Sequence, residues 1–189
     1  MKVVAFNGSP RKEGNTVTLI RQVFKMLEEE NIECELVHLA GRINGCRSCF
    51  ACLKNRNGRC AFDDDILNEC LSKIEEADGI IIGSPTYFAG LTPETKALID
   101  RAGLALGMTG RLKRKVGAAV VAARRAGAIH VFDSINAFFL ISQMIVPGST
   151  YWNIGIGRDP GDVGNDAEGL RTMDALGQNM AWLIKQLKK

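Results

Sequence analysis

Four cysteines lie close together in one stretch of the chain and are its most chemically distinctive residues. The chain has 189 residues and six cysteines. The four clustered ones follow a C-x2-C-x2-C-x7-C pattern: Cys46, Cys49, Cys52 and Cys60. Three thiolates at this spacing can bind three corners of an iron-sulfur cubane, with the fourth ligand further along the chain. The pattern favours such a cluster over a four-cysteine zinc site, which usually shows two separated C-x2-C pairs.

The residues around these cysteines also favour a cofactor. Four basic side chains lie among them: Arg47, Lys54, Arg56 and Arg59. Positive charge lowers the pKa of thiols and offsets the net negative charge of a cluster with four thiolate ligands. The same cations could dock an acidic electron carrier, or could form a solvated basic loop. Residues 41–62 show no periodic pattern, and loops longer than about 12–15 residues are uncommon unless they have a function.

The two remaining cysteines are expected in the core. Cys34 falls in a strand pattern and Cys70 on the apolar face of a helix, where a cysteine behaves as a small hydrophobic residue. A disulfide is the least favoured use of the four clustered cysteines, because we expect a cytosolic chain, in which clustered cysteines are more often metal ligands or redox-active thiols.

A second candidate site is the loop at residues 8–16, between the first expected strand and the first expected helix. It offers hydroxyl groups from Ser9 and Thr16, the guanidinium of Arg11 and the N-terminus of a helix. These groups suit a phosphate. The loop has neither the Gly-Lys-Ser/Thr of a Walker A loop nor the G-x-G-x-x-G of a dinucleotide site. The alternative is an ordinary turn in which Asn15 caps the helix.

Two further loops carry groups that suit a flavin. Tyr87 and Phe88 follow an apolar strand directly, and an aromatic pair can pack on the flat ring of a flavin or simply cover the end of the sheet. Arg124 and Arg125 follow the next strand. One of them could stabilise the negative charge of a reduced flavin or bind the phosphate of a nicotinamide cofactor. The alternative for this pair is a solvated surface.

Alternating strand and helix patterns predict the scaffold that positions these loops. Apolar runs predict strands at residues 3–6, 32–39, 79–83, 116–123 and 151–156. Helical spacing predicts helices at residues 16–30, 66–74, 93–106, 131–146 and 170–187. We therefore expect an α/β, flavodoxin-like fold: a doubly wound five-stranded parallel sheet in three layers, with the cysteine-rich loop 41–62 inserted after strand two. Ligands of such sheets bind beyond the carboxyl ends of the strands.

Composition and charge exclude several classes of protein. Hydrophobic residues make up 46%, charged residues 24%, and the net charge is +3, as in one globular domain over residues 1–189. The charge is too small and too scattered for a nucleic-acid-binding surface. No apolar run approaches the ~18 residues of a membrane span, and the first residues do not form a signal peptide. We expect a cytoplasmic protein that binds neither nucleic acid nor membrane.

These features together resemble a known family. The sequence resembles the iron-sulfur flavoproteins, a branch of the NADPH-dependent FMN reductase group with a flavodoxin-like fold. Besides the cysteine pattern, the matching segments are Gly8–Arg11, Gly14–Thr16, Ser84–Phe88, Lys96–Arg101 and Tyr151–Trp152 with Gly155 and Gly157. One departure is Arg124–Arg125, where the wider group often has small residues.

The resemblance implies two cofactors and an oligomer. It implies FMN and one [4Fe-4S] cluster per subunit, in a homodimer or homotetramer in which each cluster lies near the flavin of a neighbouring subunit. By position, the residues implied to hold the FMN phosphate are Ser9, Arg11, Asn15 and Thr16, and those implied to flank its ring system are Pro85, Thr86, Tyr87 and Phe88. We also assign Gly90 and Arg124 to the FMN site. The implied iron ligands are Cys46, Cys49, Cys52 and Cys60.

The expected function is electron transfer. We expect electrons to pass from a one-electron donor such as ferredoxin through a [4Fe-4S] cluster to FMN, and on to oxygen, peroxide or a quinone. No side chain need act as a general base, because the cofactors carry the chemistry. One alternative is a cluster-free FMN or quinone reductase that uses a nicotinamide donor. Another is a redox- or metal-sensing module on a flavodoxin-like scaffold.

Overall fold

The computed structural model describes residues 1–188 and contains a five-stranded parallel sheet with the strand order β2-β1-β3-β4-β5. The strands are β1 (Lys2–Asn7), β2 (Glu33–His38), β3 (Gly79–Pro85), β4 (Val116–Ala123) and β5 (Ile154–Ile156). The central strands β1, β3 and β4 are the near-continuous apolar runs of the sequence, and every residue of β4 is buried. This strand order is the flavodoxin-like one, so the expected fold is confirmed.

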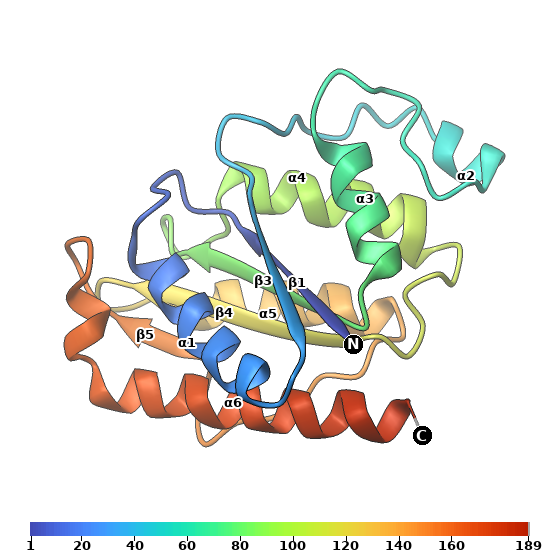
Figure 1. Ribbon diagram of the computed structural model, residues 1–189. Coiled ribbons are helices and arrows are strands. Elements are labelled where there is room, and N and C mark those ends of the chain that lie inside the picture. The colour runs from blue at the N-terminus through green and yellow to red at the C-terminus, as the bar shows by residue number, and fades with distance from the viewer. Residues whose placement is uncertain (189) are drawn as a thin grey trace.

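Helices cover both faces of the sheet (Figure 1). They are α1 (Asn15–Glu29), α2 (Ala51–Asn55), α3 (Leu67–Glu76), α4 (Pro93–Ala102), the π-helix η1 (Gly103–Gly107), α5 (Ala128–Ile141), the 3-10 helix η2 (Asp162–Asn165) and α6 (Ala167–Leu187). Helices α1 and α6 pack against each other on one face, and α3, α4 and α5 cover the other. Short α2 lies in the cysteine loop, beyond the edge of α3 (Figure 1).

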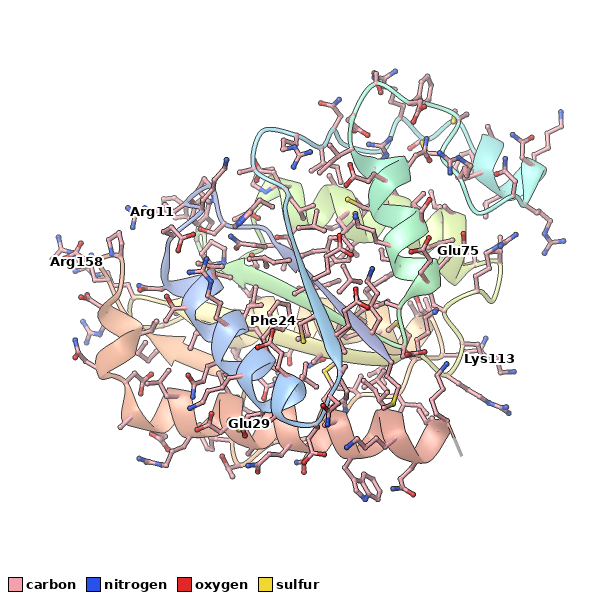
Figure 2. All side chains as sticks on the ribbon, in the orientation of Figure 1. Arg11, Phe24, Glu29, Glu75, Lys113 and Arg158 are labelled. Atoms are coloured by element: carbon pink, nitrogen blue, oxygen red, sulfur yellow. The ribbon has the colours of Figure 1, made fainter. Side chains whose placement is uncertain are left out.

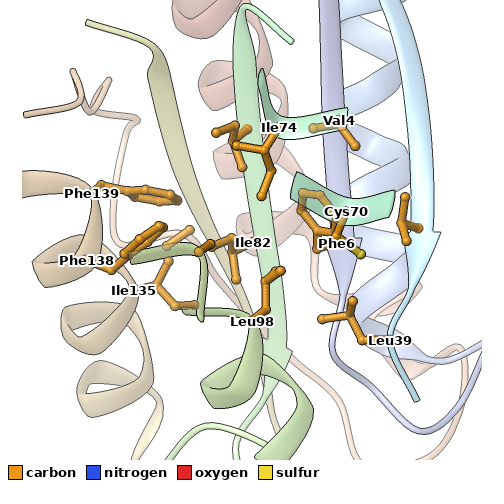
Figure 3. Close-up of a cluster of buried hydrophobic side chains, with 14 of the residues drawn as sticks. Val4, Phe6, Leu39, Cys70, Ile74, Ile82, Leu98, Ile135, Phe138 and Phe139 are labelled. Atoms are coloured by element: carbon orange, nitrogen blue, oxygen red, sulfur yellow. The ribbon is translucent and has the colours of Figure 1, made fainter. Parts of the chain in front are cut away.

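The core on the second face contains residues from every element that covers it. Figure 3 shows Phe6 of β1 and Ile82 of β3 beside Cys70 of α3, Leu98 of α4 and Ile135 of α5. All five side chains are buried. Apolar residues at helical spacing therefore pack on apolar strands, as the sequence predicts.

One helix is shorter than expected. The prediction extends α5 to residue 146, but the helix ends at Ile141. Gln143 has a left-handed backbone with φ 58°, which a helix cannot continue through. Ile145 then pairs with Val116 at the start of β4. The apolar residues after position 141 belong to this return to the sheet.

Other boundaries also differ from expectation. The helix expected at residues 93–106 changes to π-helical geometry after Ala102. Strand β5 begins later than expected, because Tyr151 and Trp152 lie exposed outside the sheet. Gly14 rather than Asn15 is the N-cap of α1. The Asn15 side chain is therefore available for another contact.

The two cysteines outside the cluster pattern lie in or beside the core. Cys70 is fully buried, and Cys34 is half-buried against the core on the α1 side. Burial raises the pKa of each thiol to about 12, so both stay protonated near neutral pH. Among the described residues, no helix combines the length and apolar character that crossing a membrane requires.

Candidate functional site

The loop after β1 is held in shape by its own hydrogen bonds. The Ser9 backbone N–H donates to Asn7 Oδ1 at 3.0 Å, and the Arg11 backbone N–H donates to Ser9 Oγ at 3.2 Å. A side chain at Gly8 would place its Cβ 1.8 Å from Thr95 Oγ1, so only glycine fits there. The loop leads into α1, whose N-cap Gly14 has no side chain to satisfy the first N–H groups of the helix.

A pocket lies at this edge of the sheet, where the carboxyl ends of β1, β3, β4 and β5 meet. Of the ten residues assigned to the FMN site, eight line it: Ser9, Arg11, Asn15, Thr16, Pro85, Thr86, Tyr87 and Arg124. Ala122, Gly157 and Arg158 also line it, although the sequence alone assigns none of the three to the FMN site. Gly157 and Arg158 follow β5, and the Gly- and Asp-rich composition of residues 155–165 was the signal that could have revealed them.

The remaining two residues assigned to the FMN site, Phe88 and Gly90, lie outside this pocket. Tyr87 and Gly90 exchange two backbone hydrogen bonds of 3.0 and 2.8 Å and so close a tight turn. Phe88 and Ala89 at its tip have left-handed φ angles of 46° and 59°. The Phe88 ring is fully exposed. Its contact with a flavin stays a prediction.

The pocket is strongly electropositive. The guanidinium groups of Arg11, Arg124 and Arg158 line it, and within residues 1–188 none of them has a side-chain partner. No carboxylate is among its lining residues in that same part of the chain. The buried Thr16 hydroxyl and the N-terminus of α1 add hydrogen-bond donors. Such an arrangement binds an anion, and a phosphate most readily.

The four clustered cysteines line a second pocket together. The chain reaches this shape through residues with left-handed φ angles: Ser48 at 50°, Phe50 at 54° and Arg56 at 52°. These bends let a short segment turn its side chains to one side. Cys46 and Cys49 are exposed, whereas Cys52 and Cys60 are half-buried.

Asn68 of α3 holds the last cysteine in place. The buried Asn68 side chain accepts a hydrogen bond from the Cys60 N–H at 2.9 Å and donates to the Cys60 carbonyl at 3.2 Å. It also donates to Asp63 Oδ1 at 2.8 Å. The fourth thiol is therefore anchored to the body of the fold although it follows the other three by several residues.

Arg101 of α4 is a cation that contacts one of the four thiols, that of Cys60. Its Nη2 donates to Cys60 Sγ at 3.2 Å, and its Nη1 donates to the Asn44 carbonyl at 2.9 Å and to Asp65. Burial alone would raise the pKa of Asp65, but the hydrogen bonds from Arg101, Asn44 and Leu67 together lower it. Arg101 is distant from the cysteines in sequence, so the spacing of the loop gives no sign of it.

The basic residues within the loop act differently from the prediction. Arg47 pairs with Asp64, and its guanidinium lies 4.2 Å from the centre of the Phe62 ring. The pKa of Cys52 is raised by burial rather than lowered by nearby cations, so the prediction is wrong for this thiol. Across residues 1–188, no three His, Cys, Asp or Glu side chains are arranged to hold a metal ion. The thiols share a pocket without converging on one centre.

Comparisons with known proteins identify the family. Residues 1–159 match the family model described as NADPH-dependent FMN reductase. An iron-sulfur flavoprotein of Methanocaldococcus jannaschii is 42% identical in an alignment 198 residues long, gaps included, which covers 100% of both chains. The chain belongs to the iron-sulfur flavoprotein family. An iron-sulfur flavoprotein of Archaeoglobus fulgidus is 39% identical over 156 residues, 81% of this flavoprotein and 75% of that one.

A solved structure agrees with the fold of this flavoprotein. RosB with its bound 8-demethyl-8-formylriboflavin-5'-phosphate has a TM-score of 0.78 and 21% sequence identity, covering 100% of this chain and 80% of that chain. With the family established, the flavoprotein is an FMN-dependent oxidoreductase. The electropositive pocket at the carboxyl edge of its sheet lies where flavodoxin-like folds bind their ligands.

Proposed function

We propose that this flavoprotein takes electrons singly from a ferredoxin-like donor and delivers them to a small acceptor such as oxygen, peroxide or a quinone. The main support for this proposal is that one chain has both a pocket lined by four cysteines and an electropositive pocket lined by three arginines. When bound, a [4Fe-4S] cluster supplies one-electron chemistry and FMN supplies both one- and two-electron chemistry.

The thiol pocket suits an iron-sulfur cluster. The ligands would be Cys46, Cys49, Cys52 and Cys60, because all four residues line one pocket. The Arg101 guanidinium already donates to Cys60 Sγ, and it would offset part of the negative charge of a cluster bound there. Cys46 and Cys49 lie on an exposed part of the loop, and binding a cluster would require the four thiols to draw together toward a common centre.

The electropositive pocket suits FMN. Ser9, Arg11, Thr16 and the N–H groups at the start of α1 would bind the phosphate. Tyr87 and the adjacent Thr86, whose hydroxyl donates to the Ala122 carbonyl at 3.1 Å, form the wall that would flank the ring system. Because Arg124 has no carboxylate partner in the described chain, it can stabilise negative charge on a reduced ring.

We further propose that two copies of the chain associate. The two pockets share no lining residue. Figure 2 shows Arg11 and Arg158 at one side of the molecule, whereas α2 of the cysteine loop lies on the opposite side in Figure 1. A groove runs from Cys46 along α4, η1 and α5, past Met108, Phe138 and Ile141. A second copy seated in this groove would cover the exposed thiols and could bring its own flavin pocket near them.

Anaerobic purification with iron and sulfide analysis tests the cluster. We expect about four iron and four acid-labile sulfide per chain together with FMN, the content of one [4Fe-4S] cluster. Cys49→Ser should lose the iron and keep FMN. The matched control Cys34→Ser, which changes a thiol outside the pocket, should keep both. FMN without iron under strict anoxia would contradict the cluster.

A cluster-free reductase that uses NAD(P)H is the second candidate. The match of residues 1–159 to the NADPH-dependent FMN reductase model favours it. Stopped-flow reduction separates the two. Rapid reduction of the flavin by NADPH supports the second candidate, whereas slow reduction by NADPH with rapid reduction by ferredoxin supports the first.

A further inference from the structure

The loop after β5, residues 157–166, brings Arg158 to the same pocket as Arg11 and Arg124. Figure 2 shows Arg158 and Arg11 on the same side of the molecule. Arg158 is exposed, and within residues 1–188 its guanidinium has no hydrogen-bond or ion-pair partner. An exposed arginine is usually a solvated surface group, but the backbone of this one is held in position by hydrogen bonds.

The backbone that carries Arg158 is braced from within its loop. Asp162 Oδ2 accepts hydrogen bonds from the backbone N–H of Arg158 at 3.1 Å and of Asp159 at 2.8 Å. One carboxylate oxygen therefore fixes two successive peptide groups. This bracing fixes the backbone from which the Arg158 side chain extends to line the pocket.

The same loop is attached to the first residue of α1. The Gly161 N–H donates to Asn15 Oδ1 at 2.9 Å. A side chain at Gly157 would place its Cβ 2.7 Å from the Val163 nitrogen and 2.8 Å from Asn15 Nδ2, so glycine is needed for this close approach. The loop that carries Arg158 and the helix end that offers free N–H groups are thus joined as one platform.

We propose that Arg158 is a phosphate-binding residue of the FMN site, and that Asn15 and Asp162 are positioning residues that hold it there. The inference rests on the proposed FMN function and extends the site to the loop after β5. A guanidinium can bind two phosphate oxygens at once, and a fixed backbone reduces the entropy lost on binding. Asn15 Oδ1 accepts the Gly161 N–H and so holds the loop that carries Arg158, while the Asn15 Nδ2 group is still a hydrogen-bond donor.

Comparison of two flavins tests Arg158 directly, because riboflavin lacks only the phosphate of FMN. Flavin-free protein is titrated with each, and quenching of flavin fluorescence reports the Kd. Arg158→Gln should weaken FMN binding about 10- to 100-fold, the loss of one charge-assisted hydrogen-bonded contact. Its riboflavin Kd should stay unchanged. The matched control Arg171→Gln, on the exposed face of α6, should bind both flavins as the wild type does.

The outcomes separate the inference from the function on which it rests. If wild-type protein binds FMN and Arg158→Gln binds it equally well, the role of Arg158 is overturned while the FMN site stands. Equal weakening of FMN and riboflavin also overturns it, because a phosphate contact cannot act on riboflavin. If the wild type binds neither flavin, both the proposed function and this inference fail.

A double-mutant cycle tests the positioning role. Asp162→Ala should weaken FMN binding in the wild-type background and have no further effect in the Arg158→Gln background. Thermal unfolding of each variant shows that the fold is intact. If the two losses add in full, Asp162 does not act through Arg158, and its positioning role is overturned.

Discussion

Arg101 joins the cysteine loop to the body of the fold. Its side chain is 4% exposed, and that of its partner Asp65 is 3% exposed. The guanidinium also donates to the Asn44 carbonyl and to Cys60 Sγ. A buried charge is tolerated only when its partners are all present, so the loop and α4 depend on each other at this residue.

Removing one charge of this pair should therefore be costly. We expect Asp65→Asn to lower the free energy of unfolding by about 3 kcal/mol, because it leaves the Arg101 guanidinium buried without its counter-charge. Urea unfolding of the two proteins measures the difference. The neighbouring control, Asp64→Asn, breaks an exposed pair with Arg47 and should cost at most about 1 kcal/mol. Equal effects would show that burial does not decide the cost.

The ion pairs of Glu35 in β2 should make the stability of the fold depend on pH. Hydrogen bonds from Lys2 at 2.8 Å and Lys73 at 2.5 Å hold the pKa of Glu35 below its usual 4.5. A carboxyl group with a lowered folded-state pKa stabilises the fold above its unfolded pKa, and this stabilisation is lost as the pH falls through the folded value. Urea unfolding is measured between pH 6 and pH 3, a range of about three pH units that includes the usual pKa of a carboxyl group. The free energy of unfolding should fall less over this range for Glu35→Gln than for wild type. Glu29→Gln, at the exposed end of α1, should behave as wild type does.

At the scale of elements, Asp166 joins β5 to α6. Its Oδ1 accepts the Gly169 N–H at 3.0 Å and so caps α6. Its Oδ2 accepts the Ile156 N–H at 2.7 Å. Strand β5 pairs only with β4 among the described strands. The carboxylate therefore occupies a donor on the free side of an edge strand that could otherwise pair with another chain.

We expect Asp166→Ala to lower the free energy of unfolding by about 1–2 kcal/mol. The change removes a helix cap and one hydrogen bond of the edge strand. Chemical denaturation measures this loss. Glu168→Ala, which removes a charge from the first turn of the same helix without removing the cap, should cost less than half as much. A loss of similar size in both variants would mean that charge near the helix end, not the cap, is what matters.

Local patterns were enough for some elements and insufficient for others. The apolar runs of β1, β3 and β4 predicted buried strands because burial on both faces leaves no polar position. Edge strand β5 was placed too early, since Tyr151 and Trp152 look like strand residues but lie exposed outside the sheet. Arg101 and Arg158 lie far in sequence from the cysteine loop and from the loop after β1, and only the fold brings each of them to its pocket. The spacing of residues within those two loops therefore cannot predict them.

At the scale of the whole molecule, the two candidate cofactor pockets lie apart and an apolar groove begins at one of them. The groove follows α4, η1 and α5 from the cysteine loop. Two exposed thiols, Cys46 and Cys49, lie at that end. An iron-sulfur cluster at a solvent-exposed site is vulnerable to oxidants, so a covering second copy would protect it as well as bring a second flavin pocket close. Under the proposed association, the same surface would serve both self-association and electron transfer.

The groove gives the last prediction, the loss of self-association on adding a charge. Ile141 lines the groove and is 76% exposed. We expect Ile141→Glu to shift the protein toward monomer in sedimentation velocity, because burying an unpaired carboxylate in an apolar interface is unfavourable. Trp182→Glu is the matched control, since Trp182 is 63% exposed on α6 and does not line the groove. FMN content should be unchanged in both variants, because neither residue lines the flavin pocket. If Ile141→Glu keeps the oligomer while Trp182→Glu disrupts it, the contact lies on α6 and the groove must have another use.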